Sequence, residues 1–269
     1  MSADAKTVFA WEPLTPRGVA AFAHARFSRL LLVQGIIALC GGAAFAWFLA
    51  DSVYPVIGEA IDNLPAAGEI RSAKLNWGGA SPQLLAEGRF LALDVDLDHG
   101  GKINSTADLQ IEFGQDTLWF DSLLGYTELG YPTGQIIAFN RPELAPLWGA
   151  WSSTLLFLAA LAVAFFLLLN WWLLATLYFL PVWLLGFFVN RDLNFCQSWR
   201  LAGAALLPGA LLMAAGILLY DFGALDLVEF GFVFGAHLIL GWLYIFVGLL
   251  FVPVLPAVLP KGNPFVPRN

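Results

Sequence analysis

The sequence predicts an α-helical membrane protein with four or five transmembrane helices and a small β-rich domain outside the cytoplasm. Hydrophobic residues make up 59% of the 269-residue chain, charged residues make up only 12%, and the mean hydropathy is +0.73. Soluble domains are nearer half apolar and a quarter charged. Several stretches without charge are long enough to cross about 30 Å of hydrocarbon. An acidic region with strand-like alternation separates the first of these stretches from the others.

The N-terminal segment, residues 1–29, is predicted to be cytoplasmic and to contain an interfacial helix. Thr15 followed by Pro16 matches an N-cap with proline in the first helical turn. Apolar and basic side chains then alternate over residues 16–29, as in a helix that lies at a membrane surface. A simple extension of the first transmembrane helix is the alternative.

Residues 30–50 carry no charge and form the first predicted transmembrane helix. Arg26 and Arg29 precede this stretch and place the N-terminus in the cytoplasm. The stretch begins too late and is too long for a cleaved signal peptide. A helical stalk is expected over residues 52–66.

Residues 51–143 are predicted to form a mainly antiparallel β domain outside the cytoplasm. They hold 14 acidic and 5 basic residues. Apolar and acidic residues alternate over 91–97, which predicts a strand with one solvent-exposed face. Residues 109–113 repeat the alternation, so a second strand is expected to return beside the first after a turn at 99–102. Further strands are expected from Ile70 to Trp77 and from Tyr126 to Tyr131.

Residues 144–260 are predicted to form a transmembrane helical bundle, followed by a tail at 261–269. The bundle begins with a charge-free run over 144–190, which is 47 residues long and exceeds one ordinary span. Length favours two spans, 149–169 and 173–190, with a hairpin at Asn170 and five spans in all. Later spans are expected at 201–220 and 230–258, separated by a short acidic loop.

The distribution of charge favours a different topology. If residues 191–200 and the tail are cytoplasmic, four basic residues join the basic N-terminus on that side: Arg191, Arg200, Lys261 and Arg268. The run 144–190 must then cross an odd number of times. Both topologies, and so the side of the C-terminus, stay open at this point.

Three alternate acids, Asp94, Asp96 and Asp98, resemble the start of a calcium loop. A helix-loop-helix calcium site needs glycine at position six and glutamate at position twelve, where this chain has His99 and Ser105. The solvated face of a strand is therefore preferred over a weak cation site. His99 has no second histidine or cysteine nearby in the domain to complete a transition-metal site.

His237 lies within the last predicted span, after the pair Gly231 and Gly235. An ionisable residue inside a membrane is a candidate functional residue, and glycines spaced four apart let helices approach closely. Packing is the preferred interpretation, and a ligand, lipid or proton role is the alternative. No catalytic, cofactor-binding or metal-binding residues are predicted, because no motif for such chemistry occurs in the chain.

The stretch from Asn194 to Gly209 joins a short polar segment to an apolar segment rich in alanine and glycine. Gln197 and Arg200 are expected to anchor a helix end at the membrane interface. Pro208 is expected to bend the helix, which neighbouring helices can tolerate.

The same stretch resembles the signature of Yip-type membrane proteins, and the match is closer to their bacterial relatives. The positions that carry the resemblance are Phe195, Gln197, Arg200, Ala204 and Pro208, together with the segment from Ile111 to Thr117. The resemblance covers about residues 30–255. It implies an extracytoplasmic domain inserted after the first span and a cytoplasmic loop before the span that contains Pro208. It implies no activity, cofactor or catalytic residue.

The sequence thus predicts a non-enzymatic accessory, scaffold or complex-subunit protein of a bacterial inner membrane. A net charge of −7 argues against nucleic-acid binding. The expected partners are the lipid bilayer and either another protein or a second copy of this chain. A protein that transports or handles a small molecule or lipid is the alternative.

Overall fold

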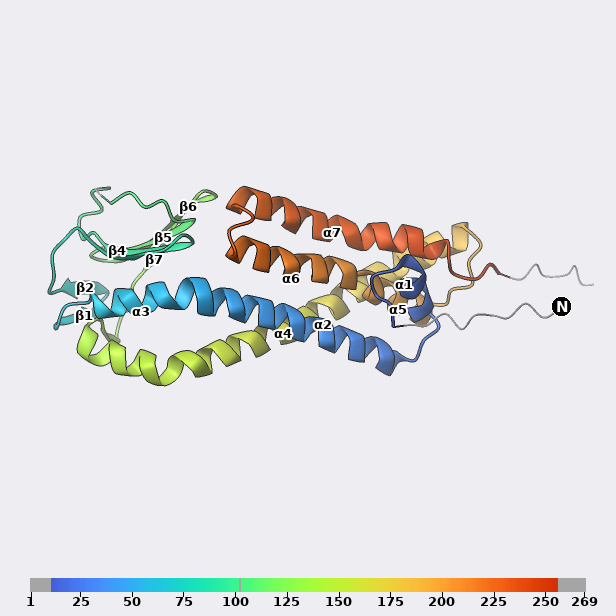
Figure 1. The fold of residues 1–269 in the computed structure, drawn as a ribbon, viewed down its shortest axis with the longest axis horizontal. Coiled ribbons are helices and arrows are strands. Elements are labelled where there is room, and N and C mark those ends of the chain that lie inside the picture. Colours follow the sequence, from blue (N-terminus) through green and yellow to red (C-terminus); the bar gives the residue numbers. More distant parts are fainter. Residues whose placement is uncertain (1–10, 102, 256–269) are drawn as a thin grey trace, which may run out of the picture. The chain divides into compact units, whose positions relative to one another are not determined.

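The computed structural model describes residues 11–101 and 103–255 (Figure 1). The chain divides into two compact units. The bundle unit contains residues 11–41, 164–214 and 232–255, and the sheet unit contains residues 42–163 and 215–231. Four helices contribute residues to both units.

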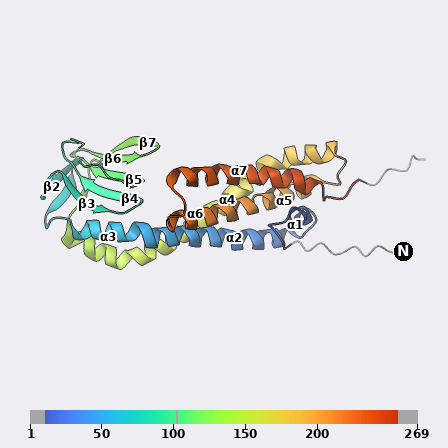
Figure 2. The same cartoon turned by 45° about the horizontal axis from the view of Figure 1, so that its top comes forward.

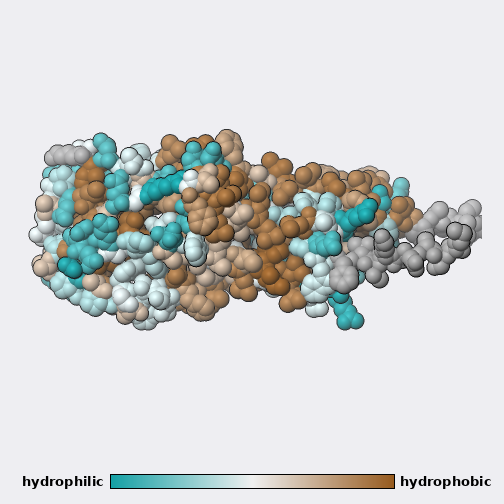
Figure 3. All heavy atoms as spheres, viewed as in Figure 1, coloured by the Kyte–Doolittle hydropathy of each residue, from teal (hydrophilic) through white to brown (hydrophobic). Residues whose placement is uncertain are grey.

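Within the described residues, four helical stretches are long and apolar enough to cross a membrane: Phe27–Asp62, Arg141–Phe188, Phe195–Asp221 and Leu227–Leu249. The helices are α1 (Pro16–Phe22), α2 (Phe27–Phe48), α3 (Tyr54–Asp62), α4 (Arg141–Phe188), α5 (Phe195–Ala205), α6 (Leu207–Asp221) and α7 (Leu227–Leu249). Hydrophobic side chains cover the long helices, whereas hydrophilic ones gather over the strands (Figure 3). Large apolar side chains exposed along whole helices are typical of surfaces that face lipid.

Helix α4 is a single helix of 48 residues. The predicted hairpin at Asn170 is therefore wrong, and residues 144–190 do not form two antiparallel helices. A lone asparagine does not end a helix, and no glycine or proline occurs between Ala150 and Leu180. At 1.5 Å per residue the helix is about 70 Å long, more than twice the thickness of the hydrocarbon core.

Helix α1 is separate from α2, so the N-terminal helix is not an extension of the first span. The hydroxyl of Thr15 accepts a hydrogen bond from the Gly18 backbone N–H, which confirms the predicted N-cap. The helix is shorter than expected, because a turn over residues 23–26 precedes α2. Val19 and Phe22 are fully buried in the core of the bundle unit, where α1 packs against α5.

The predicted stalk is present as α3, which continues α2 through one π-helical turn at Leu49–Val53. Pro55 follows this turn, and because proline has no backbone N–H it cannot donate the regular hydrogen bond of an α-helix. A π-turn absorbs the mismatch without ending the helix. Within the sheet unit, α3 packs on strands β3 and β4 (Figure 2).

Near Pro208 the helix is interrupted at one residue, Leu206, because α5 ends at Ala205 and α6 begins at Leu207, and the bend expected at Pro208 stays a prediction. The acidic loop expected before the last span is short. The side chain of Asp226 accepts a hydrogen bond from the Glu229 backbone N–H, and the side chain of Glu229 accepts one from the Asp226 backbone N–H. This reciprocal pair forms a capping box at the start of α7. Both acids therefore stabilise a helix N-terminus.

The sheet unit contains two sheets. The strands are β1 (Gly68–Arg71), β2 (Lys74–Trp77), β3 (Gln83–Glu87), β4 (Leu91–Val95), β5 (Leu109–Phe113), β6 (Thr117–Ser122), β7 (Gly125–Gly130) and β8 (Ile136–Ala138). The smaller sheet has the order β2-β1-β8 and the larger has the order β3-β4-β5-β6-β7. Apolar residues on one face of β4 and β5 form a core with Val56 and Ala60 of α3.

Two expectations about the strands are wrong. The segment from Ile70 to Trp77 forms a hairpin, because Ser72 and Ala73 both adopt left-handed backbone angles, as in a type I′ turn. Strand β5 does not return antiparallel to β4 but runs parallel to it. A parallel pair needs a crossover connection, which lies between β4 and β5, and its described residues, 96–101 and 103–108, form no helix.

Candidate functional site

Strand pairing gathers polar and aromatic side chains on one face of the larger sheet. Cross-strand partners form one row from Asp94 through Glu112 and Trp119 to Glu128. A second row runs from Ala92 through Gln110 and Asp121 to Tyr126. Residues in a row point to the same side of a sheet. We call these side chains, together with His99, the acid-aromatic face.

The crossover segment covers the β4–β5 part of this face. Gln110 donates a hydrogen bond to Asp94 at 2.9 Å and another to the Ile103 carbonyl of the crossover at 3.4 Å. The carboxylate of Asp96 accepts the backbone N–H of Gly100 at 2.8 Å. As a result Asp94 and Asp96 are buried, so the predicted solvent-exposed face is wrong for both. Only Asp98, beyond the end of β4, is exposed as expected.

His99 is not a free turn residue. Its Nδ1 lies 2.5 Å from Oε1 of the buried Glu112, and its ring stacks on Trp119 with centroids 4.2 Å apart. The hydrogen bond to Glu112 raises the pKa of His99 above its ordinary value, although burial opposes the shift. The cationic form of the imidazole is therefore stabilised where it meets the carboxylate.

Asp94 is the most perturbed carboxyl group of this face. Burial raises its pKa to about 6, and the nearby charges of Glu112 and Asp96 act in the same direction. The hydrogen bond from Gln110 opposes the shift. The second carboxyl oxygen, Oδ2, is buried and has no hydrogen-bond partner among the described residues.

The β6–β7 part of the face is left open as a cleft of about 580 Å³. It is lined by His99, Trp119, Asp121, Tyr126, Thr127 and Glu128. Two carboxylates beside two aromatic rings form an environment that suits an organic cation, through ion pairing and cation–π contact. Among the residues that the structure describes, no group of three or more His, Cys, Asp or Glu is arranged to hold a metal ion.

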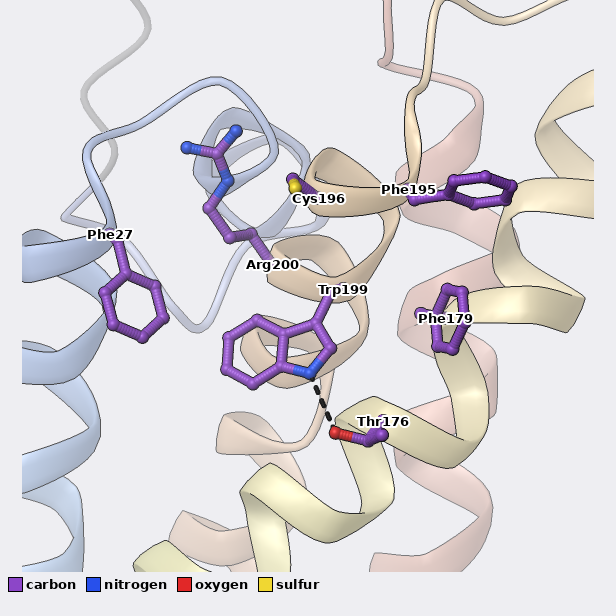
Figure 4. A pocket seen from close by; sticks show the side chains of 7 residues that line it. All are labelled: Phe27, Thr176, Phe179, Phe195, Cys196, Trp199 and Arg200. Atoms are coloured by element: carbon purple, nitrogen blue, oxygen red, sulfur yellow. Dashed lines mark hydrogen bonds between the residues drawn. The ribbon is translucent and has the colours of Figure 1, made fainter.

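The bundle unit has a cavity of its own, of about 620 Å³ (Figure 4). Aromatic side chains dominate its lining: Phe27 of α2, Phe179 of α4, and Phe195 and Trp199 of α5. Thr176, Cys196 and Arg200 complete the wall, and Thr176 accepts the indole N–H of Trp199 at 3.0 Å. The cavity is thus apolar with one cationic side chain at its border.

A buried amide that the sequence reasoning missed connects three helices of the bundle unit. Gln34 of α2 is fully buried, accepts the indole N–H of Trp172 on α4, and donates to the Gly203 carbonyl on α5. Hydrogen bonds between helices of this kind stabilise membrane bundles modestly. The available signal was that Gln34 is the one amide side chain in the charge-free run 30–50.

The predicted residues at the start of the Pro208 span have structural contacts. The side chain of Gln197 accepts a hydrogen bond from the Asn194 backbone N–H, and the side chain of Asn194 accepts one from the Gln197 backbone N–H. The two bonds form a capping box for α5. Arg200 donates to the backbone carbonyl of Ala25 and so ties α5 to the turn between α1 and α2. These contacts explain why polar residues precede the apolar segment.

Among the described residues, no polar side chain forms a hydrogen bond with His237 near Gly231 and Gly235. The Nδ1 of His237 lies against the Phe234 carbonyl, one turn earlier in α7. A Cβ placed on Gly231 or Gly235 would meet no described atom within 4 Å. The close helix contact is elsewhere, because a Cβ on Gly209 would lie 2.6 Å from the His237 carbonyl oxygen. The packing of α6 against α7 therefore requires glycine at Gly209, one residue after Pro208.

Comparison of the chain with protein-family models, with curated proteins and with solved structures gives no match. The resemblance to Yip-type membrane proteins stays a prediction.

Proposed function

We propose that the protein crosses a bacterial inner membrane four times, with both termini in the cytoplasm and the sheets outside. The candidate spans support an even number of crossings. The described part of the bundle unit contains two acidic residues, Glu12 and Asp192. It contains five arginines: Arg17, Arg26, Arg29, Arg191 and Arg200. The loop between α6 and α7 has no lysine or arginine. Basic residues in short loops stay on the cytoplasmic side, whereas acids contribute little to orientation.

Reporter fusions test this topology. We expect green fluorescent protein fused after Asn269 to fluoresce and alkaline phosphatase at the same position to be inactive, because the phosphatase matures only outside the cytoplasm. As the control, alkaline phosphatase fused after Gly223, in the α6–α7 loop, should be active. An active phosphatase at Asn269 would instead require an odd number of spans.

We further propose that the protein is a non-enzymatic accessory or scaffold whose sheet domain recruits a protein partner. The observation that carries this proposal is strand β7, an edge strand exposed along its whole length. Tyr126 and Leu129 on this strand are 74% and 61% exposed. Exposed apolar edges template pairing with another chain, and proteins usually blunt them. The adjoining cleft adds Asp121 and Glu128, which favour a basic segment in the partner.

Mass spectrometry of the tagged full-length protein, purified in mild detergent, should identify a stoichiometric partner. Replacing Leu129 with lysine should reduce recovery of that partner about tenfold, as expected for a central contact of an interface. The matched control is Leu84→Lys on β3, the opposite edge of the same sheet, where the leucine is also exposed. Equal recovery with both variants would exclude β7 as the binding edge.

The aromatic cavity of the bundle unit favours a second candidate function, lipid handling. Its lining combines rings that suit an acyl chain with Arg200, which suits a phosphate. If no partner co-purifies and a phospholipid does, this candidate replaces the scaffold.

A further inference from the structure

We propose that the turn between β6 and β7 inserts into the membrane leaflet that faces the sheet domain. The two residues at the tip of this turn are Leu123 and Leu124, which are 71% and 89% exposed. Two-residue hairpin turns ordinarily carry Asn, Asp or Gly. Exposing two leucine side chains to water at such a tip is unfavourable, whereas burying them in an apolar surface is favourable. The inference depends on the proposed membrane embedding and not on partner binding.

Strand register places this tip at the end of the sheet that is attached to the α6–α7 loop. Ser122, the last residue of β6, pairs with Leu109, the first residue of β5. Asp108, immediately before β5, accepts a hydrogen bond from Tyr220 at the end of α6. Arg89, shortly before β4, donates to the Leu225 carbonyl in the loop itself. All of these residues belong to the sheet unit.

Continuing this antiparallel register places Leu123 level with Asp108, where the sheet contacts the end of α6, and Leu124 one residue further on. The apolar part of α6 ends at Asp221, and the acids Asp221 and Asp226 on either side of the short loop mark the membrane boundary in the proposed topology. The leucines thus lie where the leaflet begins.

The local chemistry of the turn also suits insertion. The hydroxyl of Ser122 accepts the backbone N–H of Leu124 and donates to the Gly125 carbonyl. These bonds reduce the number of unpaired backbone groups that would enter lipid, where such groups are costly. No charged residue lies between Asp121 and Glu128. Tyr126, which follows the tip, is a residue type enriched at membrane interfaces.

A fluorescent probe at the tip tests the proposal. Cys40 and Cys196 are first replaced by serine, and Leu124→Cys is labelled with the environment-sensitive dye NBD in full-length protein reconstituted into phosphatidylethanolamine–phosphatidylglycerol vesicles. We expect a blue shift of the emission and a loss of intensity when lipids carrying a nitroxide on the acyl chain are included. Leu123→Cys is labelled in parallel, so that the result does not depend on one variant.

The control position is Asp98, an exposed residue beyond the opposite end of β4. NBD at Asp98→Cys should keep the emission of a probe in water and should not be quenched. Water-like emission at both tip positions would overturn the proposal, as would a blue shift without quenching by nitroxide lipids. Flotation of the vesicles after a carbonate wash measures embedding separately, so failure of the proposed membrane embedding is distinguishable from failure of tip insertion.

Discussion

Replacing Gly209 with alanine should destabilise the helical bundle by about 1–3 kcal/mol, the usual cost of forcing one extra carbon into a packed core. The added Cβ would lie 2.6 Å from the His237 carbonyl oxygen. This oxygen belongs to the backbone of α7, so it cannot rotate away as a flexible side chain could. The two helices would have to move apart at their closest contact. The loss should exceed the gain in helix propensity that alanine brings over glycine. Thermal unfolding of the purified protein in detergent, followed by size-exclusion chromatography, measures the effect.

Gly235→Ala is the matched control, because the same Cβ on α7 would meet no described atom within 4 Å. This variant should be neutral, or more stable by up to about 1 kcal/mol, since alanine is the better helix former. Equal loss of stability in both variants would contradict the structural difference between the two glycines. A loss confined to Gly235→Ala, together with a change in oligomeric state, would mean that a second copy of the chain packs on that face.

The glycines show why packing could not be derived from spacing alone. Two small-residue pairs, Gly231 with Gly235 and Ala205 with Gly209, have the same spacing in the sequence. Only the second pair is buried, and a Cβ on Gly209 would meet the backbone of α7. Spacing tells which residues share a helix face, but it does not tell which face meets another helix.

Hydropathy identified the apolar segments because it depends only on local composition, yet it could not give the number of helices in residues 144–190. A run without charges can be one long helix or two antiparallel ones, and both bury the same side chains in lipid. The turn at Ser72 and Ala73 was missed for a related reason. Neither residue favours the left-handed backbone that they adopt, so no local signal separated β1 from β2.

The acid-aromatic face was half predictable. Alternation over β4 and β5 predicted both strands, although every residue of β4 is buried. It could not indicate that a crossover would cover the acids, because that cover follows from the parallel pairing of β4 with β5. Trp119 and Glu128 lie beside Glu112 because of the register between neighbouring strands, and this register could not be predicted from the sequence.

The buried acid Asp94 should make the sheet domain less stable as the pH rises. Its pKa is raised from an ordinary value of 3.8 to about 6 in the folded protein, so the folded state binds the proton more tightly than the unfolded state. The destabilisation is absent below about pH 4, grows as the pH rises through 6, and stays constant above it. Asp94→Asn should therefore increase the free energy of unfolding at pH 7.5 by on the order of 2 kcal/mol and should have little effect at pH 4.

Thermal unfolding of wild type and Asp94→Asn between pH 4 and pH 8 checks this result, with the exposed Asp98→Asn as the control. His99 must be separated from Asp94, because its pKa is also raised in the folded state. The stabilisation from its contact with Glu112 is fully present below the ordinary pKa of histidine and is lost as the pH rises through the raised value. Asp94→Asn should therefore retain a fall in stability near neutral pH, and adding His99→Gln should remove it. If Asp94→Asn destabilises the protein equally at pH 4 and pH 7.5, a hydrogen bond rather than the buried charge governs this position.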